Sequence, residues 1–396
     1  MNSKFYWLSA AHLLSSTALS SFLLIQQYIT TNVLSSPELV GILLAVNFLP
    51  KVVFIPIGGY IADRYSKRAL LFNTTFLRII LLLWAAYFSY AGSLAMEQLY
   101  VISFVFGILD AIFIPTANSC LPYIVSNKKL HKANSIFSAC YQLGVIIGPL
   151  VISILIDDFS LTDALISTVI ILIICSLATL QVLTEPVSQN GLVEGPVKSI
   201  LSGYEVIKKI NMAQDLGFLT ITSFFFIGVL TVLTPSLAAI NFGSNAKYIG
   251  SLNAIYGVGI IAFSLFAQFS KSSLRVSLLT ATMMLSILII MLSQTTTYIL
   301  SSIIYFICGF IISWVNVSVI TTAQQRSPKE LVGKTIALIV FSSQVCLPLS
   351  FGLISLLINL NFSVPDITLI YGIGFMILSV VVAYIRHSFN IKALRE

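Results

Sequence analysis

Residues 39–68 read LVGILLAVNFLPKVVFIPIGGYIADRYSKR, and this stretch decides the class to which the protein belongs. From Leu39 to Ala62 the only charged side chain is Lys51. A helix needs about 20 predominantly apolar residues to cross a bilayer, so this run is long enough to do so. The run ends in a charged turn made of Asp63, Arg64, Lys67 and Arg68. The stretch therefore predicts a membrane-spanning helix that is followed by a loop in water.

The rest of the chain repeats this alternation of apolar runs and polar turns. Of the 396 residues, 58% are hydrophobic and 9% are charged, whereas a soluble domain carries about 25% charged residues. The solvent for most of the surface must be lipid, which cannot satisfy backbone polar groups, so each run is predicted to be a helix. We expect helices over residues 6–30, 38–62, 69–91, 98–121, 134–156, 163–184, 214–240, 248–268, 276–294, 298–322, 334–358 and 367–386.

The basic residues indicate which side of the membrane each loop occupies. With the N-terminus placed inside, every Lys and Arg except Lys51, Arg78 and Lys247 falls in an inside loop or a terminal segment. Acidic residues such as Asp157 and Asp158 fall outside. This distribution follows the positive-inside rule and predicts twelve spans of a bacterial plasma (inner) membrane, with both termini cytoplasmic. It also explains the net charge of +7 without a nucleic-acid partner.

The longest connection between the expected helices divides the chain into two halves. We expect an N-terminal bundle of six helices over residues 1–184, a cytoplasmic central loop over 185–213 and a C-terminal bundle of six helices over 214–396. Two packed halves with a solute path between them are a common transporter layout. Loop and proline features, such as Pro149 and Pro348, recur at an offset of about 200 residues, which favours an internal duplication.

The charged turn after the second expected helix resembles a family signature. Residues 58–68 resemble the G-x-x-x-D-R-x-G-R-R motif between helices 2 and 3 of the major facilitator superfamily, with Ser66 in place of the second glycine. The matching residues are Gly59, Asp63, Arg64, Lys67 and Arg68. The resemblance implies an all-α integral membrane protein with the major facilitator fold, twelve transmembrane helices in two six-helix bundles, and transport by alternating access. It also implies that the motif latches the two halves on the cytoplasmic side. The cations of the turn can in addition anchor the loop to anionic lipid.

Three further segments narrow the resemblance. Gly144, Gly148 and Pro149 resemble the G-x-x-x-G-P core of the antiporter motif found in exporters of this superfamily, without the glycines that usually follow. Small residues four apart also allow close helix packing, and that interpretation stays open. Residues 115–135 and 322–334 resemble loops of the macrolide-efflux and enterobactin-exporter branch of drug:proton antiporters. This resemblance implies export and does not identify a substrate.

Three ionisable residues lie well inside the expected helices: Lys51, Arg78 and Asp110. Such residues are costly in lipid and are usually functional. Asp110 is the candidate proton carrier with Arg78 as its coupling partner, and a fixed ion pair between the two is an equal alternative. If Lys51 and Arg78 face a central cavity, that cavity is positive and suits an anionic solute. The other interpretation of Lys51 is a side chain that snorkels along the cavity wall.

Polar side chains complete the candidate substrate cavity. Ser16, Ser20 and Gln26 lie in the first expected helix, and Gln344 lies in the eleventh. Such groups either line a polar path or form hydrogen bonds between helices.

The leading hypothesis from the sequence is secondary active export of a drug-like compound or an anionic metabolite such as a siderophore. No ATP-binding loop is found, so the proton gradient is the expected energy source and no cofactor is expected. The expected partners are the small-molecule substrate and membrane lipids, and the protein is expected to be a monomer. Uptake or facilitated diffusion of a small anionic solute is the alternative within transport.

A membrane-embedded lipid-modifying enzyme is the alternative from another class. It would need acidic or His residues clustered at a membrane face, and the sequence contains no such cluster. The five cysteines form no CxxC pair, so no metal site is expected. We therefore expect no enzymatic activity.

Overall fold

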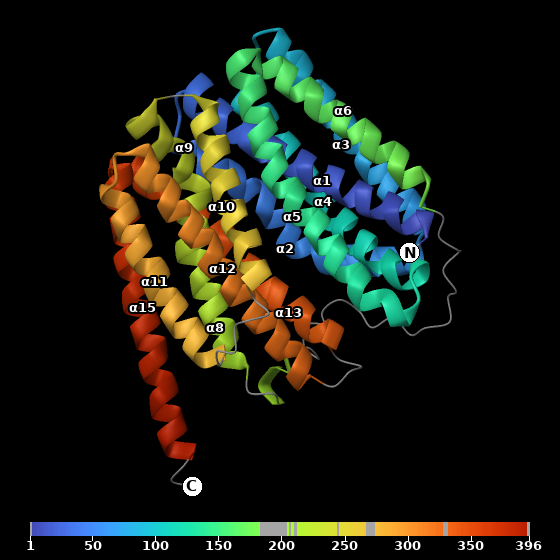
Figure 1. The fold of residues 1–396 in the computed structure, drawn as a ribbon. Coiled ribbons are helices and arrows are strands. Elements are labelled where there is room, and N and C mark those ends of the chain that lie inside the picture. Colours follow the sequence, from blue (N-terminus) through green and yellow to red (C-terminus); the bar gives the residue numbers. More distant parts are fainter. Residues whose placement is uncertain are drawn as a thin grey trace. The chain divides into compact units, whose positions relative to one another are not determined.

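The structure is a computed structural model that describes residues 2–182, 204–205, 207–209, 212–243, 245–266, 274–327 and 332–393. All the principal elements in these ranges are helices (Figure 1). The predicted central loop, residues 185–213, lies mostly outside the described residues, so its expected boundaries stay a prediction.

The elements of the first half follow one another with short connections. They are α1 (Ser3–Tyr28), the π-helix η1 (Ile29–Val33), α2 (Leu39–Arg64), α3 (Lys67–Tyr90), α4 (Met96–Ile124), α5 (Asn127–Asp158) and α6 (Leu161–Leu180). The second half contains α8 (Ala213–Thr222), the π-helix η2 (Ser223–Ile227), α9 (Gly228–Phe242), α10 (Ala246–Phe266), α11 (Leu274–Gln294), α12 (Tyr298–Arg326), α13 (Val332–Val345), α14 (Leu347–Asn359) and α15 (Val364–Ala393).

These helices confirm the predicted fold class. Within the described part of the chain, ten helical segments are long and apolar enough to cross a membrane, and two shorter apolar stretches lie in α2 and α11. Together they correspond to the twelve expected runs, because α8, η2 and α9 form one span, as do α13 and α14. The π-helices were not predicted. Each interrupts or ends the first span of its half, where one extra residue per turn widens the helix.

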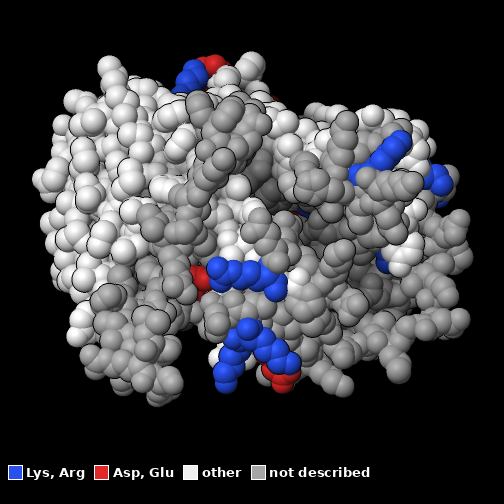
Figure 2. Space-filling view, turned by 60° about the horizontal axis from the view of Figure 1, so that its bottom comes forward, with Lys and Arg blue, Asp and Glu red and all other residues white. Residues whose placement is uncertain are grey.

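The outer faces of the helices are apolar, as a lipid environment requires. On α6 the exposed residues Ile166, Ile170, Ile173 and Leu177 are spaced so that they form one stripe. Figure 2 shows that the described surface carries few charged side chains on the walls visible in that view. Burial of these side chains in lipid removes the apolar surface from water, which favours insertion of the helices into the membrane.

The described helices group into two compact units, each with its own packing. The first unit contains α1, η1, α2 from Leu43, α3 to α6, and α10 up to Ala254. Here α1 packs along α5 and α6, and α3 packs along α6 and α4. The Asp157 carboxylate, at the end of α5, accepts hydrogen bonds from the backbone N–H groups of Ala246 and Lys247 at 2.9 and 2.7 Å, and so caps α10.

The second unit contains residues 37–42, α8, η2, α9, the rest of α10, and α11 to α15. Here α11 packs along α15 and α12, while α8 packs against α13. Between η2 and α15, Phe224 stacks on Tyr371 and Phe225 on Phe375, and Phe225 also meets Tyr371 edge-on.

Glycines mark a close helix crossing in each unit. A Cβ atom at Gly58 of α2 would collide with the backbone oxygen of Ala111 in α4, and one at Gly107 of α4 would collide with that of Asn47 in α2. In the second unit, Gly259 of α10 and Gly309 of α12 make the corresponding approach to Phe306 and Tyr256. The second pair follows the first by about 200 residues, the offset that the predicted duplication requires.

Candidate functional site

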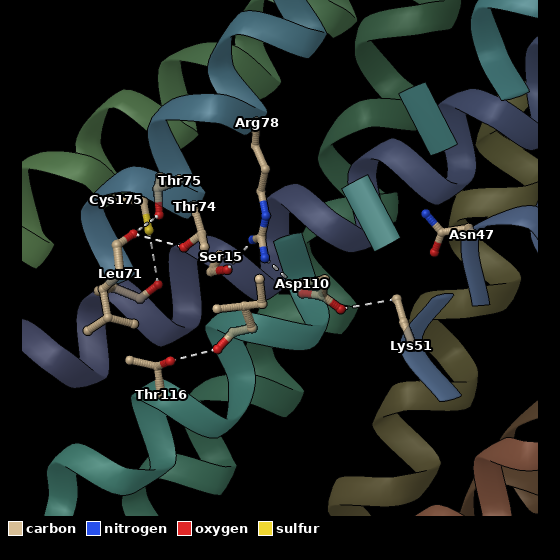
Figure 3. Close-up of polar contacts among 12 residues, drawn as sticks. Ser15, Asn47, Lys51, Leu71, Thr74, Thr75, Arg78, Asp110, Thr116 and Cys175 are labelled. Carbon is tan, nitrogen blue, oxygen red and sulfur yellow. Dashed lines mark hydrogen bonds and ion pairs between the residues drawn. The ribbon is translucent and has the colours of Figure 1, made fainter. Parts of the chain in front are cut away.

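Three charged side chains of the first unit meet in the interior between its packed helices (Figure 3). Lys51 of α2 places its Nζ 3.0 Å from Oδ2 of Asp110 in α4, and Arg78 of α3 places Nη2 3.2 Å from Oδ1 of the same carboxylate. Arg78 Nη1 also donates a hydrogen bond of 2.9 Å to the Ser15 hydroxyl of α1. The exposed fractions of Lys51, Arg78 and Asp110 are 7%, 0% and 2%. We call Lys51, Arg78 and Asp110 the charge cluster.

The glycine crossing of α2 and α4 explains why Lys51 reaches Asp110. Lys51 lies between Asn47 and Gly58 along α2, and Asp110 lies between Gly107 and Ala111 along α4. Because the two helices touch through their backbones on either side of this pair, their side chains meet there directly.

Aromatic rings surround the two cations. The Arg78 guanidinium lies 5.1 Å from the ring centroid of Phe106 and 5.0 Å from that of Phe113. These residues lie one helical turn on either side of Asp110 along α4, so all three share a face. The Lys51 Nζ lies 4.4 Å from the ring centroid of Phe48. Cation–π contacts of this kind stabilise charges that have lost their water.

The charge cluster is neither neutral nor fully hydrogen-bonded. Two cations face one carboxylate, so the cluster carries a formal net charge of +1 when all three groups are ionised. The Lys51–Asp110 contact is an ion pair without hydrogen-bond alignment, since Asp110 Oδ2 has no hydrogen-bond partner among the described residues. Arg78 Nε lacks one as well. A buried ion pair contributes stability only when its remaining donors and acceptors are satisfied. A functional role of the charge cluster is therefore a hypothesis that this geometry raises.

The structure decides part of what the sequence left open about these residues. The Arg78–Asp110 ion pair is present, and Lys51 joins it as a second cation, which was not predicted. Lys51 is buried against Asp110 instead of snorkelling along a wall. Whether Asp110 also carries a proton stays a hypothesis.

The predicted cavity residues Ser16 and Ser20 lie at the contact between α1 and α5. A Cβ atom at Gly144 or Gly148 of α5 would collide with the Oγ of Ser16 or Ser20, respectively. The Ser20 hydroxyl lies within hydrogen-bond distance of the Gly144 backbone oxygen, at 3.1 Å. In this structure these glycines therefore serve close helix packing, which was the open interpretation of the helix-5 motif, and Pro149 follows them inside α5 without ending it.

Replacing Gly144 with Ala is expected to destabilise the protein by about 1–3 kcal/mol, because the added methyl group would lie 2.5 Å from the backbone oxygen of Leu13. The matched control is Gly217→Ala, since nothing lies within 4 Å of a Cβ atom at Gly217. Thermal unfolding of the purified protein in detergent is the measurement. Equal melting temperatures for the two variants would contradict the packing role.

The other predicted cavity residues lie apart from this contact. Gln26 is fully buried in α1 and donates a hydrogen bond to the Ser103 hydroxyl of α4. Gln344 lies half-buried on α13 of the second unit.

The structure describes only part of the charged turn, residues 58–68, that resembles the superfamily signature. The side chains of Asp63 and Arg64 and the surroundings of Gly59 lie outside the described residues. Lys67 was expected to anchor the turn to lipid, but its side chain is buried. It is 2% exposed, and its Nζ donates a 2.8 Å hydrogen bond to the Ala62 backbone oxygen. It therefore caps the C-terminal end of α2, where the helix dipole favours a cation. Arg68 is half-buried and fits the lipid-anchoring expectation better.

Sequence reasoning missed several polar residues next to the charge cluster. Asn47 lies one turn before Lys51 on α2 and is fully buried, and Ser103 lies two turns before Asp110 on α4. Their spacing from Lys51 and Asp110 was a usable signal, because residues four or seven apart share a helix face. His12 of α1, by contrast, stands out in the sequence among the hydroxyl groups of its helix, and it is buried and stacks on Phe137 at a centroid distance of 3.9 Å. No group of three His, Cys, Asp or Glu that could hold a metal occurs in the described ranges.

Comparison with known proteins decides the family. The family model for the Major Facilitator Superfamily matches residues 8–351, which is most of the chain. The chain belongs to the major facilitator superfamily. This member of the superfamily is a multi-pass membrane transporter and not an enzyme.

Curated relatives of this superfamily member match only in part. The chain is 26% identical over 203 residues to the multidrug resistance protein MdtG of Proteus mirabilis, which is 50% of this chain and 46% of that protein. It is 27% identical over 127 residues to the uncharacterized MFS-type transporter YfiS of Bacillus subtilis, which is 32% of this chain and 29% of that protein. The chain therefore spans less than half the length of these relatives. They support the superfamily and not specifically the predicted macrolide-efflux and enterobactin-exporter branch.

Solved structures of the superfamily match over nearly the whole chain. The nucleoside transporter NupG aligns over 97% of this chain and 99% of its own, with a TM-score of 0.78 and 14% sequence identity. The POT family transporter PepTSo aligns over 99% of both chains, with a TM-score of 0.76 and 12% identity. At these identities the comparison establishes the fold alone.

Proposed function

We propose that this transporter carries a small anionic solute and couples its movement to protons through Asp110. The observation that carries the proposal is the buried charge cluster, in which one carboxylate lies between two cations. When Asp110 is ionised, it competes with a solute anion for Lys51 and Arg78. When Asp110 is protonated, the cluster carries a formal charge of +2, and both cations are free to bind an anion.

Proton and anion therefore favour each other's binding at this cluster. By thermodynamic linkage, the factor by which a proton strengthens anion binding equals the factor by which the anion strengthens proton binding. A transporter that loads both together is a symporter, and proton influx would then drive uptake of the anion. This makes uptake, the alternative considered for the sequence, the direction that the charge arrangement favours.

Export is the second candidate function. Its support is that several relatives are named multidrug resistance proteins. A drug-like compound would then be the substrate class, or an anionic metabolite such as a siderophore. In either direction we propose a monomer in the bacterial plasma (inner) membrane with both termini cytoplasmic, supported by the loop distribution of Lys and Arg. The proton gradient is the proposed energy source, with no cofactor.

Transport in everted membrane vesicles with an acidified interior distinguishes uptake from export. Benzenesulfonate is a suitable probe, because it is anionic at every relevant pH and crosses lipid poorly. Preloaded vesicles that contain the transporter should lose radiolabelled benzenesulfonate faster when the interior is acidified, because protons and anions leave together. Proton-driven accumulation of the probe would support export and overturn symport. Absence of any proton-dependent movement would contradict both.

Replacing Lys51 with Gln is expected to weaken benzenesulfonate binding about tenfold, which corresponds to about 1.4 kcal/mol for one lost charge contact. The control is Lys247→Gln, because the Lys247 side chain is 48% exposed and pairs with Asp158. Equilibrium dialysis with the purified protein measures both affinities. If Lys51→Gln and Lys247→Gln bind the probe equally well, the anion site is not at the charge cluster.

A further inference from the structure

Two buried amide side chains meet at one serine beside the charge cluster. Gln26 of α1 donates a hydrogen bond from Nε2 to the Ser103 hydroxyl, and Asn47 of α2 donates one of 3.0 Å from Nδ2 to the Ser103 backbone oxygen. Both amides are 0% exposed. Two helices, α1 and α2, thus bring amide groups to Ser103 of α4, and we call Gln26, Asn47 and Ser103 the amide cluster.

Each amide of this cluster leaves its oxygen without a hydrogen-bond partner in the described part of the chain. The orientation of Asn47 is fixed, because the Ser103 backbone oxygen can only accept a hydrogen bond, so the nitrogen of Asn47 must face it. Its Oδ1 is therefore an acceptor that has no hydrogen-bond partner among the described residues. The free end of Gln26 can be an acceptor or a donor, because the Ser103 hydroxyl can play either role.

A buried acceptor without a partner is costly, so a donor is expected at this position when the protein works. A metal cation is disfavoured there, because Lys51 lies one turn from Asn47 on the same helix and the charge cluster is already net positive. Figure 3 shows Asn47 and Lys51 on the same side of Asp110, opposite Arg78. The remaining donors are water and an O–H or N–H group of a bound solute.

We propose that the amide cluster is a subsite for a hydroxyl or amide N–H group of the transported anion, whose charge lies at Lys51. The proposal rests on the proposed anion transport and narrows its substrate class to anions that carry a hydrogen-bond donor. Side chains four residues apart on a helix have Cβ atoms about 5–6 Å apart. Because Lys51 and Asn47 share one face of α2, the charge and the donor are expected near one another on the solute.

Three related sulfonates test the subsite in the purified protein. 3-Hydroxybenzenesulfonate offers a donor, 3-methoxybenzenesulfonate has a similar shape with no donor, and benzenesulfonate has neither group. Wild type should bind the hydroxy compound about tenfold more tightly than the methoxy compound, as one hydrogen bond to a buried acceptor allows. In Asn47→Leu, which keeps the branched shape of the side chain without its polar atoms, this ratio should fall to about one while benzenesulfonate affinity stays within about twofold.

The control variant is Asn118→Leu. Asn118 of α4 also donates to a backbone oxygen, that of Ile114 at 2.9 Å, but it is exposed, so the ratio should stay at the wild-type value. Equal binding of the hydroxy and methoxy compounds by wild type, or a tenfold ratio kept in Asn47→Leu, would overturn the subsite alone. So would a structure with 3-hydroxybenzenesulfonate bound in which only a water contacts Asn47 Oδ1. If wild type binds none of the three sulfonates, the proposed anion site fails as well.

Discussion

Replacing Asp110 with Asn is expected to reduce proton-driven movement of benzenesulfonate to the level of protein-free liposomes. Asn cannot take up or release a proton, so the charge cluster would hold Lys51 and Arg78 without the group that responds to pH. Binding of the anion should not be lost, because the two cations no longer face a competing carboxylate. The expected variant thus still exchanges labelled for unlabelled anion and no longer responds to a pH gradient.

This combination separates a coupling role of Asp110 from simple loss of structure. Removing one partner of a buried ion pair costs about 3–5 kcal/mol, so a lower melting temperature is expected as well. The control is Asp158→Asn, whose side chain is 49% exposed and pairs with Lys247. Transport in proteoliposomes with and without a pH gradient is the measurement. If Asp110→Asn still moves the anion in response to the gradient, the coupling role of Asp110 is wrong.

Replacing Gly107 with Val is expected to abolish benzenesulfonate binding and to destabilise the protein. A Cβ atom at Gly107 would collide with the backbone oxygen of Asn47, so α2 and α4 would have to separate. The separation would withdraw Lys51 from Asp110 and Asn47 from Ser103. Overpacking of this kind costs about 1–3 kcal/mol by itself, before any loss of the ion pair.

Gly217→Val is the matched control, because nothing lies within 4 Å of a Cβ atom at Gly217. In this control, the benzenesulfonate affinity measured by equilibrium dialysis and the melting temperature should both be close to the wild-type values. A Gly107→Val protein that binds the anion and unfolds like the control would show that the α2–α4 crossing does not position the site.

The helices were predictable because lipid leaves the chain few choices. A run such as residues 39–62 has to satisfy its own backbone, so its length and composition already predict a helix. The structure extends several expected helices by a few residues, for example α4 to Ile124 and α12 to Arg326. The π-helices were not predictable, since hydropathy does not distinguish one wider turn of Ile29–Val33 from an α-helical turn.

The charge cluster was predictable only in part. The cost of burying Lys51, Arg78 and Asp110 singled them out as candidate functional residues. Their pairing depends on how α2, α3 and α4 are rotated and where they cross, and no single helix carries that information. Gly58 and Gly107 encode the crossing, but a glycine does not reveal which backbone it will touch.

For Lys67, the sequence predicted a contact with lipid that the structure does not show. The positive-inside rule places Lys67 among the expected loop cations, but the rule does not predict whether a given cation faces lipid or a helix end. Its contact with Ala62 depends on the turn between α2 and α3. Ser16 and Ser20 were predicted as cavity residues, and hydroxyl groups can serve both polar paths and helix contacts. In this structure they contact glycines of α5, a contact that the sequence of α1 alone does not reveal.

Proton uptake on anion binding tests most directly the claim that Asp110 links the anion to the proton. Calorimetric titration of the purified protein with benzenesulfonate, repeated in buffers of different ionisation enthalpy, counts the protons exchanged, and the probe itself does not titrate. Wild type is expected to take up protons as the anion binds, and Asp110→Asn is expected to take up none. No uptake by wild type, or the same uptake by both proteins, would contradict the account.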